Sequence, residues 1–350
     1  MKETIKKILD SGVQAPSGSN SQPWRFSVRG KRIHVEALPE KDHPVLNFRN
    51  RGTWVAHGAL IENISIAALE YGYTARIELF PDRKMPHITA KITLEMHDGG
   101  KSPLFPCIGR RTTNRKPYEK KTLNESQKNE FLSVLSSEER PCVRLIDGQE
   151  ELKSLGEVMS VNEIVMFENR RLHNLFFKEI IWSDKDRTPG LLLDTLELKP
   201  PQKAALRIFR YWQATNLLNK LFSVGKKIAR DNARSYASTS AIGAILAEDD
   251  DTAFINAGRT MERLWLKSAE MGLSFHPVTG VLFLRQVFMA GLTEGFSNEH
   301  IHLVKEAYGK ISSICGAKDE RIVALLFRLG YGGEPTATSF KLSPNITFED

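Results

Sequence analysis

The sequence predicts an α+β protein built from two similar halves, each with a long helix followed by β-strands. The chain has 350 residues, which is enough for two domains or one large domain with a sizeable core. Hydrophobic patterns of helical and of strand period alternate along it. Two glycine-bounded helical segments, 58–72 and 258–272, also resemble each other.

The two segments match at both ends and along one apolar face. One such match is weak support, because amphipathic helices look alike, but the shared terminal glycines strengthen it. We therefore expect a duplicated pair of α+β units that forms an intramolecular pseudo-dimer, with the two helices packed together and clefts built from loops of both halves. The identical positions are Gly58 and Gly258, Glu62 and Glu262, Glu70 and Glu270, and Gly72 and Gly272.

The first predicted half covers residues 1–106. A tight turn at Gly30 joins two of its strands. Its elements are a helix at 3–15, a polar loop at 15–23, strands at 26–28 and 32–37, a helix at 54–71, strands at 73–80 and 88–95, and a linker at 97–106.

The second predicted half covers residues 107–350. The acidic turn before residue 252 should cap the next helix rather than bind a metal. The expected elements are a helix at 122–135 with Thr122 as N-cap and Glu125 in the capping box, a strand at 143–146, helices over 150–182, a strand at 240–246, a helix at 256–272 followed by a strand and turn to 281, an irregular and partly helical stretch at 283–317, a strand at 322–329 and a polar tail.

Residues 183–230 interrupt the second half and are predicted to form a lid. The stretch 183–202 lacks a regular pattern, whereas 203–230 is basic, aromatic-rich and helical in period. Long insertions of this kind often cover a site. Partner contact is an alternative. A position on a membrane surface is another, although Pro200, Pro201 and the mixed charge weigh against it.

The composition is that of an ordinary globular protein, with 41% hydrophobic and 26% charged residues. The formal charge of +7 and the pI of about 9.2 suit an anionic ligand such as a phosphate, or solubility alone. Since no basic block is rich in aromatic residues, we expect no nucleic-acid partner.

Cysteine usage and hydropathy indicate a cytoplasmic protein. Cys107, Cys142 and Cys315 are widely separated, which fits a reducing compartment and neither a disulfide framework nor a zinc site. No segment has the pattern of a signal peptide or the length of a membrane span. We therefore expect no metal and no membrane contact.

Two polar stretches could bind a ligand. Residues 15–23 combine small hydroxyl and amide side chains, which can contact a polar ligand or simply cap a turn. Residues 108–118 place four cations among threonines, which suits phosphate but also a solvated surface. The turn at 277–280 could let its backbone approach a flat ligand closely.

Together these residues resemble the FMN-dependent nitroreductase family. The resemblance rests on three motifs and covers most of the chain outside roughly 150–230. It is closest to a double-length, lidded branch in which two fused halves imitate a homodimer. The motifs are Ala15-Pro16-Ser17-Gly18-Ser19-Asn20-Ser21-Gln22-Pro23-Trp24, Arg110-Arg111-Thr112-Thr113-Asn114-Arg115, and Gly272 through Pro277-Val278-Thr279-Gly280.

The resemblance implies two nitroreductase-like α/β halves with mainly antiparallel sheets, flanking helices and a helical lid. It also implies an FMN site with a role for each matching residue. Arg110 and Thr112 would hold the phosphate with Lys341 from the tail. Arg115 would reach the pyrimidine edge, and the backbone N–H of Thr279 would face flavin N5. The whole implied cofactor set is Pro16, Ser17, Gly18, Ser19, Asn20, Arg110, Arg111, Thr112, Arg115, Asn232, Pro277, Val278, Thr279, Gly280, Ser339 and Lys341.

The sequence departs from the family pattern in three places. Thr279 stands where many members have Glu, the first half has no arginine motif, and the second half has no Gln-Pro-Trp loop. We therefore expect one complete flavin site, a degenerate second one, and a functional monomer or weak dimer.

The implied activity is NAD(P)H-dependent reduction of a nitroaromatic, quinone or similar acceptor by ping-pong hydride transfer through the flavin. It needs no dedicated catalytic side chain, because the cofactor carries the redox chemistry. His276 could donate a proton, although a structural role is favoured. A protein that sequesters FMN beneath the lid is the main alternative. A flavin-free relic is a third, disfavoured by the intact phosphate motif.

Overall fold

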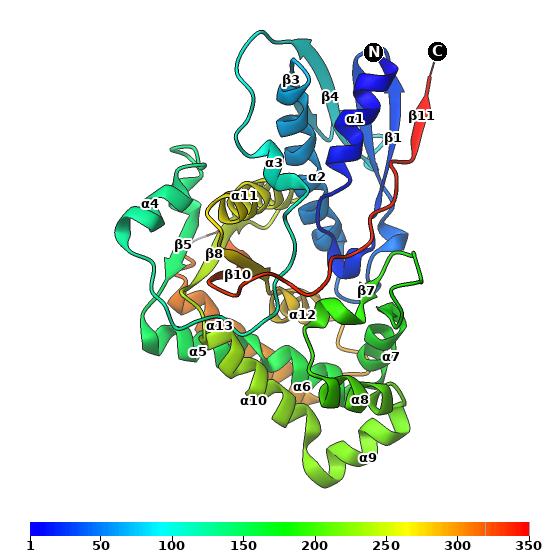
Figure 1. Ribbon diagram of the computed structural model, residues 1–350. Helices are drawn as coiled ribbons and strands as arrows, with labels where there is room; N and C mark the ends of the chain where they lie inside the picture. Colours follow the sequence, from blue (N-terminus) through cyan, green and yellow to red (C-terminus); the bar gives the residue numbers. More distant parts are fainter. Residues whose placement is uncertain (319, 350) are drawn as a thin grey trace.

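Two mainly antiparallel sheets joined through a pair of crossed helices form the framework of the protein (Figure 1). The computed structural model describes residues 1–318 and 320–349, so positions 319 and 350 of the second predicted half lie outside the described residues. The mixture of helices and antiparallel strands confirms the predicted α+β class.

The first sheet has five strands in the order β11-β1-β2-β4-β3. All of its neighbouring pairs are antiparallel except β1 with β11. Its inner face carries Phe26, Ile33 and Ile92, which are fully buried against helices because apolar residues alternate along each strand. The strands are β1 (Trp24–Arg29), β2 (Arg32–Ala37), β3 (Tyr73–Leu79), β4 (Ile88–Met96) and β11 (Ile346–Phe348).

The second sheet has four antiparallel strands in the order β5-β8-β10-β9. β8 and β10 are buried along almost their whole length, as expected for central strands covered by helices on both faces. The strands are β5 (Val143–Ile146), β8 (Ala241–Glu248), β9 (Ser274–Pro277) and β10 (Arg321–Gly330); β6 (Ile180–Ile181) and β7 (Leu191–Leu192) form a separate small sheet.

The helices fill the space between and around the sheets. Their bounds are α1 (Lys2–Gly12), α2 (Arg51–Glu70), α3 (Phe105–Ile108), α4 (Glu125–Leu132), α5 (Gln149–Met159), α6 (Val161–Glu168), α7 (Arg170–Glu179), α8 (Pro200–Phe209), α9 (Trp212–Phe222), α10 (Val224–Ala237), α11 (Asp251–Glu270), α12 (Gly280–Met289) and α13 (Asn298–Ile314).

The repeated helices α2 and α11 cross at their equivalent glycines. A Cβ on Gly58 would lie 2.0 Å from the carbonyl oxygen of Ile255, and a Cβ on Gly258 would lie 2.1 Å from that of Val55. These contacts are equivalent, since each joins a glycine to the residue three positions before the other glycine. The helix pairing predicted from the repeat is thus present, and only glycine lets the backbones approach this closely.

The shared glutamates flank the crossing. Glu62 pairs with Arg259 at 2.9 Å and with Arg263 at 3.2 Å, while Glu262 pairs with Arg111 at 3.1 Å. One apolar core runs through the crossing and includes side chains from both predicted halves. The two predicted halves therefore share this core, while a second apolar cluster lies almost wholly in the second half.

The C-terminal tail ties the halves together a second time. After β10 it runs across the molecule and adds β11 to the edge of the first sheet, so both chain ends lie at the same end of the protein (Figure 1). Phe26 N–H donates to the Asn345 carbonyl at 2.9 Å. The sequence division at residue 106 therefore does not describe the tail, which belongs to the first sheet.

The predicted lid is helical. Helices α8, α9 and α10 cover most of residues 200–237, and α9 forms the far tip of the molecule (Figure 1). Together with α6 and α7 they enclose their own apolar cluster, which includes Phe167, Phe177 and Leu206. The insertion is therefore a packed helical layer rather than a loose loop.

Two sequence expectations are wrong in detail. Residues 283–317 are mostly helical, because the spacing of Val304, Ala307 and Ile311 places all three on the buried face of α13. Helix α4 is capped by Asn124 with Gln127, and Thr122 lies before the cap. Within residues 1–318 and 320–349, no helix is both long enough and apolar enough to cross a membrane.

The crossing predicts a large effect of a single methyl group. Gly58→Ala should lower the free energy of unfolding by about 1–3 kcal/mol, because the new Cβ must displace backbone atoms rather than a flexible side chain. Urea unfolding measures this. Gly309→Ala, at an open position in α13, is the matched control and should be neutral or stabilising. Equal midpoints for both variants would contradict a close backbone crossing.

Candidate functional site

The polar loop between α1 and β1 has an unusual backbone conformation. Ser19, Asn20 and Gln22 all have positive φ, at 44°, 58° and 51°. The fold must hold this geometry, since left-handed conformations are costly for residues other than glycine. The Ser17 hydroxyl accepts from the Gln22 N–H at 2.9 Å, and the Ser19 hydroxyl donates to Glu179 at 2.6 Å.

The same loop holds the C-terminal tail. Asn20 donates to the carbonyl of Phe340 at 2.8 Å, and Gln22 accepts from the N–H of Leu342 at 2.9 Å. Between them, the Lys341 ammonium donates to the Ala15 carbonyl at 2.7 Å and to Asn20 Oδ1 at 3.0 Å. The predicted loop and the predicted tail cation therefore meet although about 320 residues separate them in sequence.

The arginine motif places its two adjacent arginines differently. Arg111 is buried, pairs with Glu262, donates to the Gln14 carbonyl at 2.6 Å and stacks over Trp265. Arg110 is exposed and lies outside the cavities described below. The buried arginine is thus the second of the pair.

A polar cavity of about 150 Å³ lies where the loop, the arginine motif and the tail converge. It gathers most of the predicted phosphate and ring ligands in one place. Its lining includes Pro16, Ser17, Ser19, Asn20, Arg111, Thr112, Thr113, Arg115, Thr338, Ser339 and Lys341.

The electrostatics of this cavity suit an anion. The pKa of Lys341 is lowered to about 7, chiefly by desolvation and then by the neighbouring Arg111, while Glu262 acts in the opposite sense. When Lys341 is protonated, two cations lie near one buried carboxylate, which leaves an excess of positive charge in a poorly solvated site. A phosphate would offset this excess and accept hydrogen bonds from Thr112 and Ser339.

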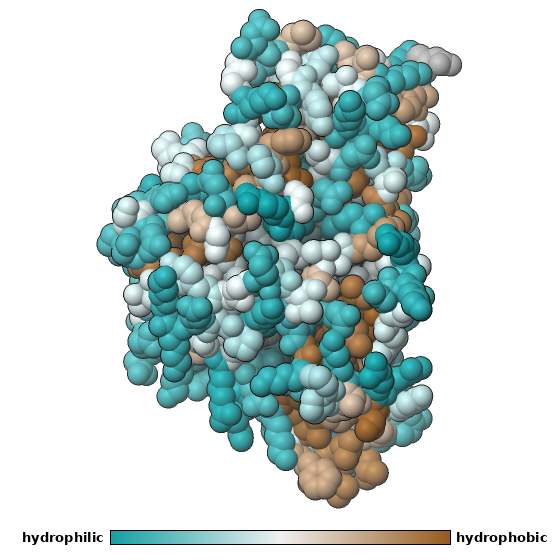
Figure 2. Space-filling view, in the orientation of Figure 1, coloured by the Kyte–Doolittle hydropathy of each residue, from teal (hydrophilic) through white to brown (hydrophobic). Residues whose placement is uncertain are grey.

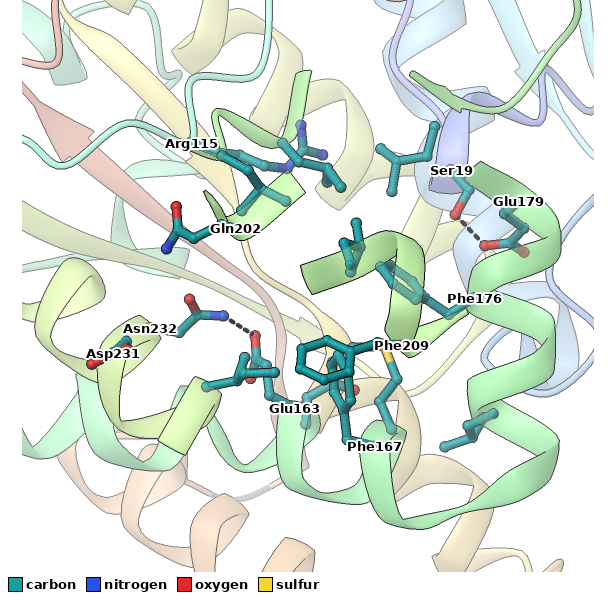
Figure 3. Close-up of a pocket in the computed structure, with 18 of the residues that line it drawn as sticks. Ser19, Arg115, Glu163, Phe167, Phe176, Glu179, Gln202, Phe209, Asp231 and Asn232 are labelled. Carbon is teal, nitrogen blue, oxygen red and sulfur yellow. Dashed lines mark hydrogen bonds between the residues drawn. The ribbon is translucent and has the colours of Figure 1, made fainter. Parts of the chain in front are cut away.

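An apolar cavity of about 420 Å³ adjoins the polar one and shares Ser19, Arg115 and Leu191 with it. The lid forms much of its wall (Figure 3). Its apolar lining comprises Leu46, Met166, Phe167, Leu172, Phe176, Leu191, Leu196, Leu198, Ala205, Leu206, Phe209 and Ile228.

Arg115 lies between the two cavities. Its guanidinium donates to the Thr195 carbonyl at 3.0 Å and makes no ion pair within the described part of the chain. Burial lowers its pKa, but an arginine remains charged. It therefore offers a cation to a ligand that extends through both cavities.

A carboxyl group faces the apolar cavity. Glu163 is 8% exposed, and its Oε1 accepts from Asn232 at 2.9 Å (Figure 3). The same oxygen accepts from the Tyr236 hydroxyl, also at 2.9 Å. Its Oε2 has no hydrogen-bond partner among the described residues. Burial raises the pKa of Glu163 to about 7, with the two hydrogen bonds opposing the shift. The group can therefore hold or release a proton near neutral pH.

His276, the proton donor considered from the sequence, is poorly suited to that role. Burial lowers its pKa well below the usual value, and the nearby Arg115 and Arg328 lower it further. Its Nδ1 lies 3.4 Å from the guanidinium of Arg328. The neutral ring thus lines the cavity wall and accepts from a buried arginine.

The remaining predicted residues lie at the margins of the two cavities. Asn232 lines the apolar cavity from α10 and donates to Glu163. The turn from Pro277 through Val278 and Thr279 to Gly280 is half-buried and opens α12, whose first N–H groups lack helical partners. A Cβ on Gly280 would meet Asn162, a cavity-lining residue, at 2.4 Å. Gly18 packs near Asp42 instead.

Sequence reasoning missed Glu163, Tyr236 and Glu179. Glu163 had a visible signal, since it is the one carboxylate inside the apolar helix Val161–Glu168, whose other glutamate, Glu168, is its last residue. Tyr236 and Glu179 had none, because their role depends on how α7 and α10 pack. Within the described ranges 1–318 and 320–349, no group of three or more His, Cys, Asp or Glu is placed to hold a metal.

Comparison with known proteins gives distant matches. No protein-family model matches the chain. An uncharacterized protein of Mycobacterium tuberculosis (strain CDC 1551 / Oshkosh) is 24% identical over 286 residues, which cover 79% of this chain but 39% of that protein. A protein of Mycobacterium tuberculosis H37Rv named "Putative NAD(P)H nitroreductase" is 28% identical over 118 residues, 33% of this chain and 34% of that protein.

Among solved structures, a nitroreductase with bound FMN from Bacteroides fragilis aligns with 69% of this chain and 95% of its own length, at 12% identity and a TM-score of 0.36. The chain thus spans well under half the length of the relatives it matches by sequence. The FMN and the NAD(P)H nitroreductase activity in these names are properties of the matched proteins.

The Glu163 carboxyl predicts a specific pH dependence of stability. Its folded-state pKa of about 7 exceeds the usual 4.5, so the folded chain keeps a proton that the unfolded chain releases between these values. Free energy of unfolding therefore falls as pH rises through this window. Glu163→Gln removes this ionisation. Between about pH 4 and about pH 8, the free energy of unfolding of the variant should therefore rise by up to about 3 kcal/mol relative to that of wild type.

Urea unfolding at several pH values measures this difference. The matched control is Glu157→Gln, a change at an exposed carboxylate on α5, which should follow the wild-type profile. A constant offset between Glu163→Gln and wild type across the range would show that Glu163 ionises normally.

Proposed function

We propose that the chain is an FMN-binding oxidoreductase of nitroreductase type, which uses NAD(P)H to reduce a nitroaromatic, quinone or similar electron-poor acceptor. The observation that carries the proposal is the pairing of a cationic, hydroxyl-lined cavity with an apolar one, with Arg115 at their junction. FMN has this distribution, with an anionic phosphate, a polar chain and a flat ring. When bound, FMN would supply the hydride chemistry.

The residues of the chain would bind and orient. Lys341, Thr112 and Ser339 would hold the phosphate, with Arg111 fixed behind them by Glu262. Arg115 would offer its charge to the polar edge of the ring. The Thr279 backbone N–H would face flavin N5, because Thr279 is the N-cap of α12 and backbone N–H groups at a helix start have no partner within the helix.

Glu163 would donate a proton to the electron acceptor. Its carboxyl faces the cavity with one oxygen unpaired among the described residues, and Asn232 and Tyr236 fix its orientation. Reduction of an electron-poor acceptor by hydride also requires a proton. A carboxyl with a pKa near 7 can deliver one near neutral pH.

The pairing of α2 with α11 supports a functional monomer. The two helices meet within one chain, and the loop of the first half and the motif of the second line a single cavity. We therefore propose that one copy of the chain carries a complete site.

Sequestration of FMN is the second candidate, and the packing of the lid favours it. The lid helices share an apolar cluster with α6 and α7, and Leu206 and Phe209 belong both to this cluster and to the cavity wall. A lid held this firmly would restrict access of nicotinamide to a bound ring.

The phosphate assignment predicts unequal effects of removing two cations. Lys341→Met should weaken FMN binding by about 10- to 100-fold, because a charge-assisted hydrogen bond in a desolvated site is lost. Arg110→Ala removes an exposed cation and should change affinity little. Titration of apo-protein by flavin fluorescence measures both. A larger loss with Arg110→Ala would move the phosphate to the first arginine of the motif.

An anaerobic titration separates the two functions. Purified protein with bound FMN should lose its flavin absorbance when NADH or NADPH is added, and an acceptor should restore it. A protein that binds no flavin even after FMN addition would contradict both functions. Bound flavin that neither nucleotide bleaches would support sequestration, and Phe209→Ala, which opens the lid cluster, should then permit bleaching.

A further inference from the structure

The tip of the lid exposes a group of large apolar side chains. Helix α9 and the end of α8 carry them on the face turned away from the protein. Figure 2 shows the resulting hydrophobic surface at the far end of the molecule. We call this surface the lid tip; it consists of Ile208, Tyr211, Leu217, Leu221 and Phe222, which are 54–62% exposed.

Such a surface is unusual at the end of a helical layer. The opposite face of α9 already packs on the protein through the buried Thr215, and Asn219 donates to the Phe167 carbonyl at 2.5 Å. The outward apolar residues leave more than half of their surface in solvent. Contiguous exposed apolar surface of this kind marks an interaction site.

The segment that carries the lid tip is rich in basic residues. Residues 199–237 contain nine lysines and arginines and one acid, Asp231, giving a formal charge of +8, while the whole chain has +7. The remainder of the protein is thus close to neutral. The cations are Lys199, Lys203, Arg207, Arg210, Lys220, Lys226, Lys227, Arg230 and Arg234.

Most of these cations are available to a partner. Eight of them are exposed, and Lys203 is half-buried with Asp194 as its partner. Lys226 and Arg234 make long surface pairs of 3.7 Å and 3.6 Å, which are worth little in water. Lys227 lies 5.9 Å from the Phe222 ring, so charge and apolar surface are directly adjacent.

We propose that the lid tip docks on the surface of an anionic lipid bilayer, with its apolar side chains inserted among the headgroups and its cations at the phosphates. A projecting apolar tip on helices that also carry long cationic side chains matches the layered chemistry of that surface. A nucleic acid would satisfy the cations but leave the exposed Ile208, Leu217 and Leu221 unmatched, and an apolar protein groove would leave the cations unmatched.

The strength of this docking would be that of a reversible peripheral contact. Each basic residue near an anionic surface contributes about 1 kcal/mol, and a small inserted apolar patch adds to it. The proposal does not depend on the redox function. It does depart from the sequence expectation of no membrane contact, because the acids that made the insertion look mixed in charge precede residue 199.

Docking would also place the apolar cavity close to lipid. The inner faces of α8 and α10 line this cavity through Leu206, Phe209 and Ile228, while the same helices carry the cations outside. An apolar ligand leaving the bilayer would therefore meet the lid first.

Co-sedimentation with vesicles tests the proposal. The full chain should pellet with phosphatidylcholine vesicles containing about one third phosphatidylglycerol and stay in solution with pure phosphatidylcholine, and salt at about 1 M should release it. Leu217→Gln/Leu221→Gln/Phe222→Gln and Lys226→Glu/Lys227→Glu should each reduce the bound fraction by at least about tenfold.

Matched controls lie at the opposite end of the molecule. Lys6→Glu/Lys7→Glu makes the same charge change on α1, and Met96→Gln removes an equally exposed apolar side chain. Both should bind like wild type. The proposal is overturned if the wild-type chain does not bind anionic vesicles, or if the control variants lose as much vesicle binding as the lid-tip variants. Concentration-dependent dimerisation that only the lid-tip variants abolish, without vesicle binding, would assign the surface to a second copy instead.

Discussion

The close crossing of α2 and α11 is the constraint on which the rest of the structure depends. Glycine at positions 58 and 258 lets the two backbones touch, and everything on either side is positioned by that contact. Each sheet packs on its own long helix, so the crossing fixes one sheet relative to the other. Since backbone contacts cannot yield as side chains do, the relation between the halves is rigid.

The helix pair α2 and α11 is nearly symmetric at the crossing, but the site beside it is asymmetric. The two shared glutamates occupy equivalent places, but their partners differ. Glu62 faces Arg259 and Arg263 from the opposite helix, whereas Glu262 faces Arg111 from the cavity wall. The second arrangement fixes a buried arginine beside Lys341 and concentrates positive charge in a single cavity.

The lid adds a second environment to this charged one. Its inner side is apolar and almost free of charge, so the carboxyl of Glu163 is poorly solvated there and keeps its proton to about pH 7. Its outer side is strongly cationic. One helical layer therefore separates a low-dielectric cavity from a charged surface, and the two faces can serve different ligands.

Much of this could be predicted from the sequence, and the remainder has identifiable physical reasons. Local patterns placed the sheets and the long helices, because amphipathic periodicity and terminal glycines act within a few residues of one another. The repeat predicted the pairing of α2 with α11. The motifs at 15–23 and 108–118 and the tail residue Lys341 were singled out from the sequence, and all three line one polar cavity. The structure alone decided that Arg111 and not Arg110 faces inward, that the tail joins the first sheet, and that Glu163 faces a cavity. Each of these depends on contacts between residues far apart in the chain, and burial, which sets the charge and the proton affinity of a group, exists only once those contacts have formed.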